Sequence, residues 1–164
     1  MIAVAFNVPI AEFHTASTVS ERLAGLGPRI LGDNFDEAAV VLSLESRPEL
    51  SVADALLAQS LLAGMGNVFK SEVCFTAGIN PFRLVGTLHR TETERLVAQS
   101  RRLLLASRSG GYRNTTGRMN RWERAWVYGR SGEPCRRCGT AILGQKQAPG
   151  GRVTFWCPQC QPGA

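Results

Sequence analysis

Four of the five cysteines form two CxxC pairs, and eighteen residues separate the pairs. This spacing is typical of a zinc site in which four thiolates complete one tetrahedron. Two disulfides are the alternative, but nothing else in the sequence indicates an oxidising compartment. Because thiolates occupy every ligand position, none is left for a catalytic water. We predict one structural Zn²⁺ ion bound by Cys135, Cys138, Cys157 and Cys160.

The basic residues are the second group that could do chemistry, and they are concentrated in one part of the chain. The sequence has 19 Lys and Arg against 13 Asp and Glu, a formal net charge of +6. Residues 101–164 hold twelve of the basic residues and two of the acidic ones. Seventeen of the basic residues are arginines, whose planar guanidinium group matches the geometry of phosphate. Nucleic acid is the predicted partner, and a basic surface without a partner is the alternative.

The segment between the two cysteine pairs must fold back as a hairpin if all four thiolates are to reach one metal ion. Apolar residues lie on both sides of Gly150 and Gly151, as two antiparallel strands require. Arg152 is therefore expected at or near the tip of this hairpin. There it either reaches a groove or phosphate of a duplex or remains a solvated charge on a turn.

Helical periodicity dominates the chain before the cysteines. The apolar spacing predicts a helix over 36–46, with Asp33 and Asn34 as possible caps. A capping-box pattern at Ser51 predicts a second helix, which ends at Gly64. These elements, with those that follow, indicate a bundle of about four helices.

A glycine-rich turn follows the second predicted helix. The residues from Gly64 to Asn67 read GMGN, in which both glycines can adopt positive φ and Asn67 can cap a new helix that runs to about Thr76. A further capping box predicts a helix from Thr91 to about Ser107. A helix, a glycine-rich turn and a second helix often present helix N-termini to phosphate, although an ordinary helical hairpin has the same pattern.

Three other segments have weaker patterns. Residues 1–13 alternate between apolar and polar side chains, which predicts one strand or two short ones. Residues 112–120 are polar and read as a surface loop. Trp122, Trp126 and Tyr128 are predicted to pack between the helical part and the cysteine region rather than to stack on bases.

The sequence also bears on the compartment. No stretch has the roughly 20 apolar residues that a membrane helix needs. The first residues lack the basic segment and the small-residue cleavage site of a secretory signal. We therefore expect a cytoplasmic protein that makes no contact with a membrane.

Three segments together resemble the C-terminal half of the formamidopyrimidine-DNA glycosylase and endonuclease VIII family. They are LGPRIL at 26–31, ALLAQSLLAGMGNVFKSEVCFTAGINP at 55–81 and VYGRSGEPCRRCGTAILGQKQAPGGRVTFWCPQCQ at 127–161. The resemblance implies a mainly α fold, with a helix-two-turn-helix bundle followed by a small antiparallel β zinc finger, or zinc ribbon. The implied divisions are remnant strands of a missing N-terminal β-sandwich at 1–18, a helix-two-turn-helix DNA-binding domain at 19–125 and a four-cysteine zinc finger at 126–164.

The resemblance also implies base excision repair on duplex DNA that contains damaged bases or abasic sites. The family flips out a damaged base, cuts its glycosidic bond and cleaves the abasic strand by elimination. On this basis Asn67 and Arg152 hold the phosphates beside the extruded nucleotide. Gly66 and Lys70 lie on the same turn and contribute backbone N–H groups and charge. Arg130 lies near the junction with the zinc finger and belongs to the same DNA-binding set.

The sequence departs from the family in its catalytic groups. The family uses an N-terminal proline amine as nucleophile, followed by a glutamate, whereas positions 2 and 3 here are Ile2 and Ala3. The catalytic lysine of the family's β-sandwich is also unmatched, since the only lysines are Lys70 and Lys146. We therefore predict no catalytic residue in this chain. We expect a monomeric DNA-binding C-terminal portion of a glycosylase and abasic-site lyase that is inactive by itself.

Two other functions stay open. The chain could be a catalyst that uses a substitute amine such as Lys70, in which case borohydride would trap a covalent product on an abasic duplex. It could also be a non-enzymatic zinc-ribbon scaffold that binds protein or structured RNA, with equal affinity for damaged and intact duplex. The predicted DNA-binding function requires affinity that falls with salt, because each phosphate neutralised by arginine releases counterions.

Overall fold

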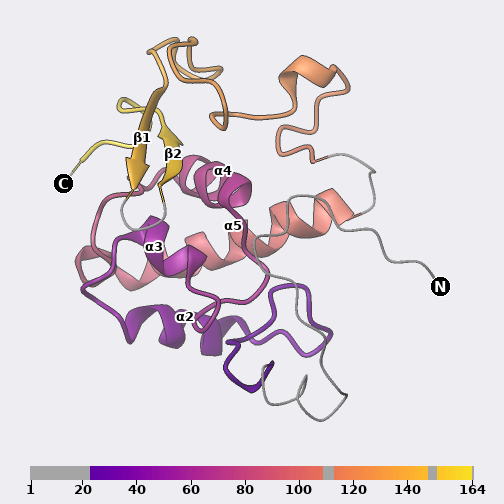
Figure 1. Cartoon of the computed structure of the whole chain (residues 1–164), viewed down its shortest axis with the longest axis vertical. Helices are drawn as coiled ribbons and strands as arrows, with labels where there is room; N and C mark the ends of the chain where they lie inside the picture. The colour runs from indigo at the N-terminus through magenta and orange to yellow at the C-terminus, as the bar shows by residue number, and fades with distance from the viewer. Residues whose placement is uncertain (1–22, 109–112, 148–150, 164) are drawn as a thin grey trace.

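The computed structural model describes residues 23–108, 113–147 and 151–163, which form a helical bundle with a small two-stranded sheet at its side (Figure 1). The prediction of a mainly α fold followed by a small antiparallel ribbon is confirmed. The strand predicted over 1–13, and with it the division at 1–18, lies outside the described residues. The elements in order are α2 (Glu37–Glu45), α3 (Val52–Leu57), α4 (Asn67–Ala77), the 3-10 helix η1 (Val85–Thr87), α5 (Arg90–Arg108), the 3-10 helix η2 (Arg121–Glu123), β1 (Leu143–Gln147) and β2 (Arg152–Trp156).

The start of α2 differs from its predicted caps. Asp36 is the N-cap, and its side-chain Oδ1 accepts a hydrogen bond from the backbone N–H of Ala39 at 3.1 Å. Asp33 and Asn34 lie too far before the first turn to reach an unpaired amide there, so the prediction that they cap the helix is wrong. The predicted helix from Thr91 to about Ser107 agrees with α5 to within one residue at each end.

Helix α3 ends earlier than the sequence suggests. Its start is as predicted, because Ser51 Oγ accepts a hydrogen bond from the Asp54 N–H at 3.1 Å. The helix stops at Leu57 instead of continuing to Gly64. The residues after it pair with the segment 27–30 through backbone hydrogen bonds, including Gly27 N to Gln59 O at 2.9 Å and Ile30 N to Ala63 O at 3.0 Å. Tertiary partners for the backbone therefore replace the helical ones.

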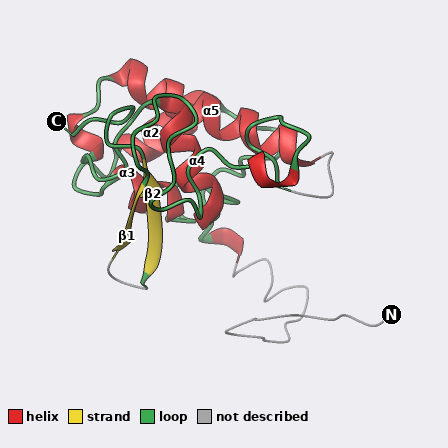
Figure 2. Ribbon diagram, turned by 90° about the horizontal axis from the view of Figure 1, so that it is seen from above, coloured by secondary structure: helices red, strands yellow, loops and turns green. Residues whose placement is uncertain are grey.

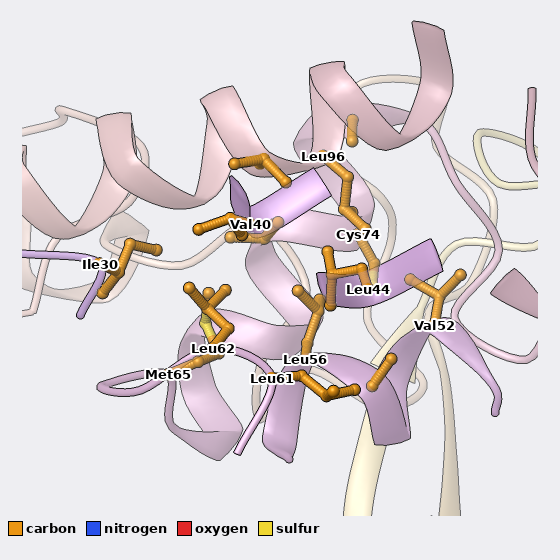
Figure 3. Packing of buried hydrophobic residues seen from close by; sticks show 14 of the residues in the cluster. Ile30, Val40, Leu44, Val52, Leu56, Leu61, Leu62, Met65, Cys74 and Leu96 are labelled. Carbon is orange, nitrogen blue, oxygen red and sulfur yellow. The ribbon is translucent and has the colours of Figure 1, made fainter. Parts of the chain in front are cut away.

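The main core lies where α2 and α4 pack against the long helix α5 and α3 packs against α4 (Figure 3). Burying each of these aliphatic side chains stabilises the fold by about 1.5 to 3 kcal/mol before entropy is counted. Cys74 also belongs to this core. It has no exposed surface and packs as an apolar residue, as predicted. Other buried members that Figure 3 labels are Ile30, Val40, Leu44, Val52, Leu56, Leu61, Leu62, Met65 and Leu96.

Helix α4 lies between this core and the ribbon (Figure 1, Figure 2). It contacts α3 and α5 on one side and β2 on the other. Its residue Phe75 belongs to a second, smaller core with Val127, Ile142 and two of the zinc-ligand cysteines. Every residue from Lys70 to Phe75 is buried. The helix therefore has no solvent face along this stretch, and each side chain meets either the bundle or the ribbon.

The three aromatic residues predicted to pack at the junction differ in their surroundings. Trp126 stacks on Phe75 with ring centroids 5.5 Å apart, and Tyr128 meets Phe155 edge to face at 5.2 Å. These two confirm the prediction. Trp122 is 75% exposed, so the prediction that it packs in the core is wrong for this residue. It lies on the short helix η2, beyond the reach of either core.

Candidate nucleic-acid interface and zinc centre

The four predicted zinc ligands converge as their spacing requires. All four Sγ atoms lie within 4.8 Å of one another. The Cys135 and Cys160 sulfur atoms are 3.9 Å apart, and those of Cys138 and Cys157 are 3.5 Å apart. A tetrahedral site with Zn–S bonds of about 2.3 Å has sulfur–sulfur edges of about 3.8 Å. The donor set and its size fit one structural Zn²⁺ ion with no open position.

The thiol pKa values show why this cluster needs a cation. Burial raises the pKa of Cys157, and it raises the pKa of Cys160 strongly, with the neighbouring thiols raising the latter further. Hydrogen bonding to Thr140 lowers the pKa of Cys138 to about 6. Four thiolates this close repel one another, so they cannot all deprotonate unless a positive charge lies among them. A divalent ion at the centre removes that cost, which is the usual coupling between metal binding and thiol ionisation.

The hairpin between the cysteine pairs places Arg152 at the turn end of the sheet. Strands β1 and β2 pair antiparallel, with Leu143 opposite Trp156 and Gln147 opposite Arg152. Arg152 is thus the first residue of β2 and belongs to the pair nearest the turn. Its side chain is exposed. The position agrees with the expectation that this arginine lies at or near the hairpin tip.

The glycine-rich turn before α4 differs in detail from its prediction. Only Gly64 adopts positive φ, at 103°, whereas Gly66 is extended and is the N-cap of the helix. Asn67 is the first helical residue and does not cap α4. Its side-chain Nδ2 instead donates a hydrogen bond to Val153 O at 3.3 Å, and its Oδ1 is buried without a partner among the described residues.

This hydrogen bond brings two predicted site residues close together. Val153 directly follows Arg152 in β2, so the N-terminus of α4 lies beside the strand that begins with this arginine. The first turn of an α-helix has backbone N–H groups without helical partners, and these favour anions. Gly66, Asn67 and Arg152 are therefore neighbours at one edge, as the predicted phosphate-binding set requires.

Lys70 does not lie on the glycine-rich turn. It is in the second turn of α4 and has no exposed surface. Its Nζ donates to Thr154 Oγ1 at 2.6 Å and to Gln147 Oε1 at 3.1 Å. Burial lowers the pKa of this amine from its ordinary 10.5 to about 8. The expectation that Lys70 lies on the turn beside Gly66 is corrected, because the ribbon covers the helix at this point.

Arg130 is also held inside the protein. Its guanidinium donates to Trp126 O at 2.5 Å and to Pro134 O at 2.8 Å, and it pairs with Glu133 Oε2 at 2.8 Å. Its side chain is only 9% exposed. Arg130 lies at the junction with the zinc finger, as expected, but in this structure its donors stabilise the loop that leads into the first cysteine pair.

Glu72 is a central residue that the sequence reasoning missed. Its buried carboxylate accepts backbone hydrogen bonds from Trp126 at 2.8 Å, Val127 at 2.9 Å and Tyr128 at 2.8 Å, and a further one from the Thr115 hydroxyl. It thus fixes both ends of the segment between α5 and the ribbon. The only signal in the sequence was an acidic residue among the apolar residues of the predicted helix, directly after Lys70 and Ser71, and it identifies no partner.

A cavity of about 290 Å³ lies beside the N-terminal part of α4. Val68 lines it from the helix, and the segment that Glu72 holds in place lines the rest. The predicted surface loop over 112–120, of which residue 112 lies outside the described residues, is therefore anchored at Thr115, which is buried against Glu72. The other lining residues are Arg113, Thr115, Arg124, Ala125 and Tyr128.

Comparison with protein families matches both parts of this architecture. Residues 26–116 match the formamidopyrimidine-DNA glycosylase H2TH domain, where H2TH stands for helix-two-turn-helix. The chain belongs to the formamidopyrimidine-DNA glycosylase and endonuclease VIII family. Residues 132–163 match a zinc finger found in this glycosylase family and in IleRS, which agrees with the zinc centre described above.

Relatives within the family include two curated bacterial proteins. The DNA-(apurinic or apyrimidinic site) lyase Nei2 of Mycolicibacterium smegmatis is 42% identical over 97% of this chain and 62% of its own length. The formamidopyrimidine-DNA glycosylase of Acidiphilium cryptum is 40% identical over 90% of this chain and 57% of its own length. The chain therefore spans about three fifths of the length of these relatives.

Solved structures of family members share the fold. The MutM (Fpg) protein of Thermus thermophilus superposes with a TM-score of 0.77 at 30% identity, over 91% of this chain and 58% of its own. The Lactococcus lactis Fpg in complex with DNA that contains an abasic site has a TM-score of 0.75 at 29% identity, over 90% of this chain and 56% of its own. Among the described residues, no helix is both long and apolar enough to cross a bilayer.

Proposed function

We propose that this chain binds, as a monomer, duplex DNA that contains damaged bases or abasic sites, as the DNA-binding portion of a base-excision-repair glycosylase and abasic-site lyase. The observation that carries the proposal is the contact between the N-terminus of α4 and β2, made by Asn67 and Val153 at 3.3 Å. It places Gly66, Asn67 and Arg152 at one edge, with a helix terminus and an exposed guanidinium. Both groups favour phosphate.

Charge and relatives support the same partner. The twelve basic residues of 101–164 create a positive field that attracts a polyanion without reading its sequence. The Lactococcus lactis Fpg was captured on DNA with an abasic site, and this chain shares its fold at 29% identity. A damaged base must leave the base stack before an enzyme can reach it. A module that binds the phosphates beside the damaged base stabilises the distorted backbone.

The chemistry that we assign to the whole protein is excision of a damaged base followed by strand cleavage at the abasic site. The fold offers no support for Lys70 as a substitute nucleophile, because its amine is buried and bonded to Thr154 and Gln147. We keep the division into residues 19–125, which bind DNA through the helix-two-turn-helix unit, and 126–164, which form the zinc finger. A cytoplasmic location, together with the DNA, is part of the proposal.

The test is fluorescence anisotropy of the zinc-loaded chain with a duplex that contains an abasic-site analogue and with its undamaged twin, at two salt concentrations. We expect tighter, salt-dependent binding to the lesion duplex. R152Q should weaken binding about tenfold, because a charge-assisted contact is lost, and lower the log–log salt slope by about 0.9 for the phosphate released. The matched control is R47Q, which removes an exposed arginine that pairs with Glu49 between α2 and α3.

Three results would contradict the proposal or the site that it assigns. A salt slope near zero would show that phosphates are not the ligand. Equal affinity for damaged and intact duplex, together with tighter binding to a protein or structured RNA, would favour the zinc-ribbon scaffold instead. An equal effect of R152Q and R47Q would move the phosphate contact away from the edge formed by Gly66, Asn67 and Arg152.

A further inference from the structure

Lys70 connects the helical bundle to the zinc ribbon from a position that DNA cannot reach. We propose that it is a positioning residue, which holds the hairpin on α4 and so sets the place of Arg152 relative to Asn67. The inference rests on the proposed function, because it assigns Lys70 a role through Arg152 in binding DNA. It replaces the expectation that Lys70 touches a phosphate itself.

The contacts of the amine join both strands of the hairpin. Lys70 Nζ lies 2.6 Å from Thr154 Oγ1 on β2 and 3.1 Å from Gln147 Oε1 on β1. The Thr154 hydroxyl in turn donates to Gln147 Oε1, so the three side chains form a closed set. Gln147 is the register partner of Arg152. Through Gln147, the Lys70 amine thus contacts the strand pair nearest the turn, whose other member is Arg152.

The same set extends to the start of α3. Gln147 Nε2 lies 3.4 Å from Asp54 Oδ1 and 3.5 Å from Ser51 Oγ. Ser51 and Asp54 form the cap of α3, and Ser51 Oγ also bonds the Asp54 carboxylate at 2.6 Å. The turn end of the hairpin is therefore fixed by two helices, and Lys70 supplies the charged donor at the centre.

Strand β2 has two further contacts with α4, on either side of the Lys70 contact. Asn67 Nδ2 donates to Val153 O at 3.3 Å, and Ser71 Oγ accepts from Phe155 N at 3.2 Å. Residues 153, 154 and 155 are thus each bound by one residue of α4. Lys70 differs from the other two because its partners are side chains on both strands, so its loss removes a contact to β1 as well as one to β2.

The electrostatic surroundings link Lys70 to Arg152. Burial is the main cause of the low pKa of the Lys70 amine, and the charge of Arg152 lowers it further. Cys74 on α4 and Asp54 on α3 act in the opposite direction. The groups that face the amine therefore come from all three elements packed around it. A phosphate bound at Arg152 would offset this repulsion, so the amine and the arginine are coupled through the same ligand.

The experiment is a double-mutant cycle on the full zinc-loaded chain, with the abasic-analogue duplex as the probe. The variants are K70M, which keeps length and removes the charge, R152Q, and both together. R47Q is again the matched control, since Arg47 is exposed and pairs with Glu49 between α2 and α3. All four proteins are first compared with the wild type for zinc content and circular dichroism.

If Lys70 acts through Arg152, K70M and R152Q each weaken binding about tenfold, and the double variant is no weaker than R152Q alone. The salt slope of the double variant then equals that of R152Q. R47Q should leave the affinity nearly unchanged. A direct phosphate contact by Lys70 predicts a different result, in which the losses multiply to about a hundredfold and the slope falls by about a further 0.9.

The positioning role is overturned if the two losses multiply or if K70M binds like the wild type. The failure of the proposed function looks different, because the wild type then shows no salt-dependent binding or R152Q has no effect. If K70M loses zinc, T154V replaces it in the cycle, since it removes the hydroxyl that Lys70 binds. T154S keeps that hydroxyl and should restore wild-type affinity, whereas equal losses in T154V and T154S would overturn the proposal.

Discussion

The helical bundle and the zinc ribbon are stabilised in different ways, and both depend on α4. The bundle buries a large, continuous set of aliphatic side chains around α5. The ribbon shares a core of five buried residues with α4, and two of these are the metal ligands Cys135 and Cys157. Hydrophobic burial is therefore sufficient for the first region, while the second needs metal and polar contacts.

The two sides of α4 show the same contrast. The side toward the bundle presents apolar residues such as Val73 and Cys74. The side toward the ribbon and its connecting segment presents Lys70, Ser71 and Glu72, all buried and all hydrogen-bonded across the interface. Buried polar groups stabilise a fold only when every one has a partner. Such an interface is thus specific in register, as the proposed DNA contact of Arg152 would require.

Removal of zinc should produce the largest difference between the ribbon and the bundle. Structural zinc contributes apparent binding free energies of about 10 to 16 kcal/mol in small zinc domains. We expect a chelator to unfold residues 130–161 while the helices between 37 and 108 stay folded, because their core contains no zinc ligand. Backbone amide NMR spectra before and after chelation measure this directly. Persistence of the ribbon signals, or loss of the bundle signals with them, would contradict the division.

The next largest effect should come from Glu72. E72A leaves three backbone N–H groups without their acceptor in the interior and removes one of the two acceptors near the Thr115 hydroxyl. We expect a loss of about 3 to 5 kcal/mol in the free energy of unfolding, measured with urea. The control is E94A, whose carboxylate forms a surface pair with Arg90 in which both side chains are 49% exposed, so that its loss should cost about 1 kcal/mol or less. Similar losses in both variants would show that Glu72 is not the link described here.

Lys70 makes the stability of the interface depend on pH. Its pKa is about 8 when folded and 10.5 ordinarily, so the unfolded chain binds the proton more tightly than the folded one. Stability should therefore rise between pH 8 and pH 10.5, by up to about 3 kcal/mol, and the penalty is fully present below pH 8. Urea unfolding of the wild type and K70M across this range isolates the effect, since other titrations cancel in the difference. A constant difference would contradict the lowered pKa.

The smallest effect is expected at Trp122. Since its side chain is 75% exposed, W122A should change the free energy of unfolding by about 0.5 kcal/mol or less. W126A is the matched variant, because Trp126 stacks on Phe75 at the ribbon interface and should cost about 3 to 5 kcal/mol. Thermal unfolding of the two variants compares an aromatic residue outside the cores with one between them. Equal costs would place Trp122 in the interface after all.

Local patterns were a reliable guide where the physical cause is itself local. The capping residue Ser51 and the periodicity of α5 depend on neighbours within a few positions, and both were predicted. The end of α3 at Leu57 was not, because the backbone of the next residues pairs with a segment some thirty positions earlier. Asp36 caps α2 instead of Asp33 or Asn34, because its carboxylate accepts a hydrogen bond from the N–H of Ala39, three residues later.

The functional residues divide in the same way. Four thiolates at CxxC spacing specify a tetrahedral zinc site by their chemistry alone, and the concentration of arginine in 101–164 indicates a polyanion partner. The sequence did not show that the side chains of Lys70, Arg130 and Glu72 are buried. Whether such a side chain meets solvent depends on which element packs over it, and the ribbon covers α4 from more than seventy residues away. The sequence by itself therefore determined the metal centre and indicated a polyanion partner, whereas only the tertiary structure decided which charged residues stay exposed, as Arg152 does, and which hold the two regions together.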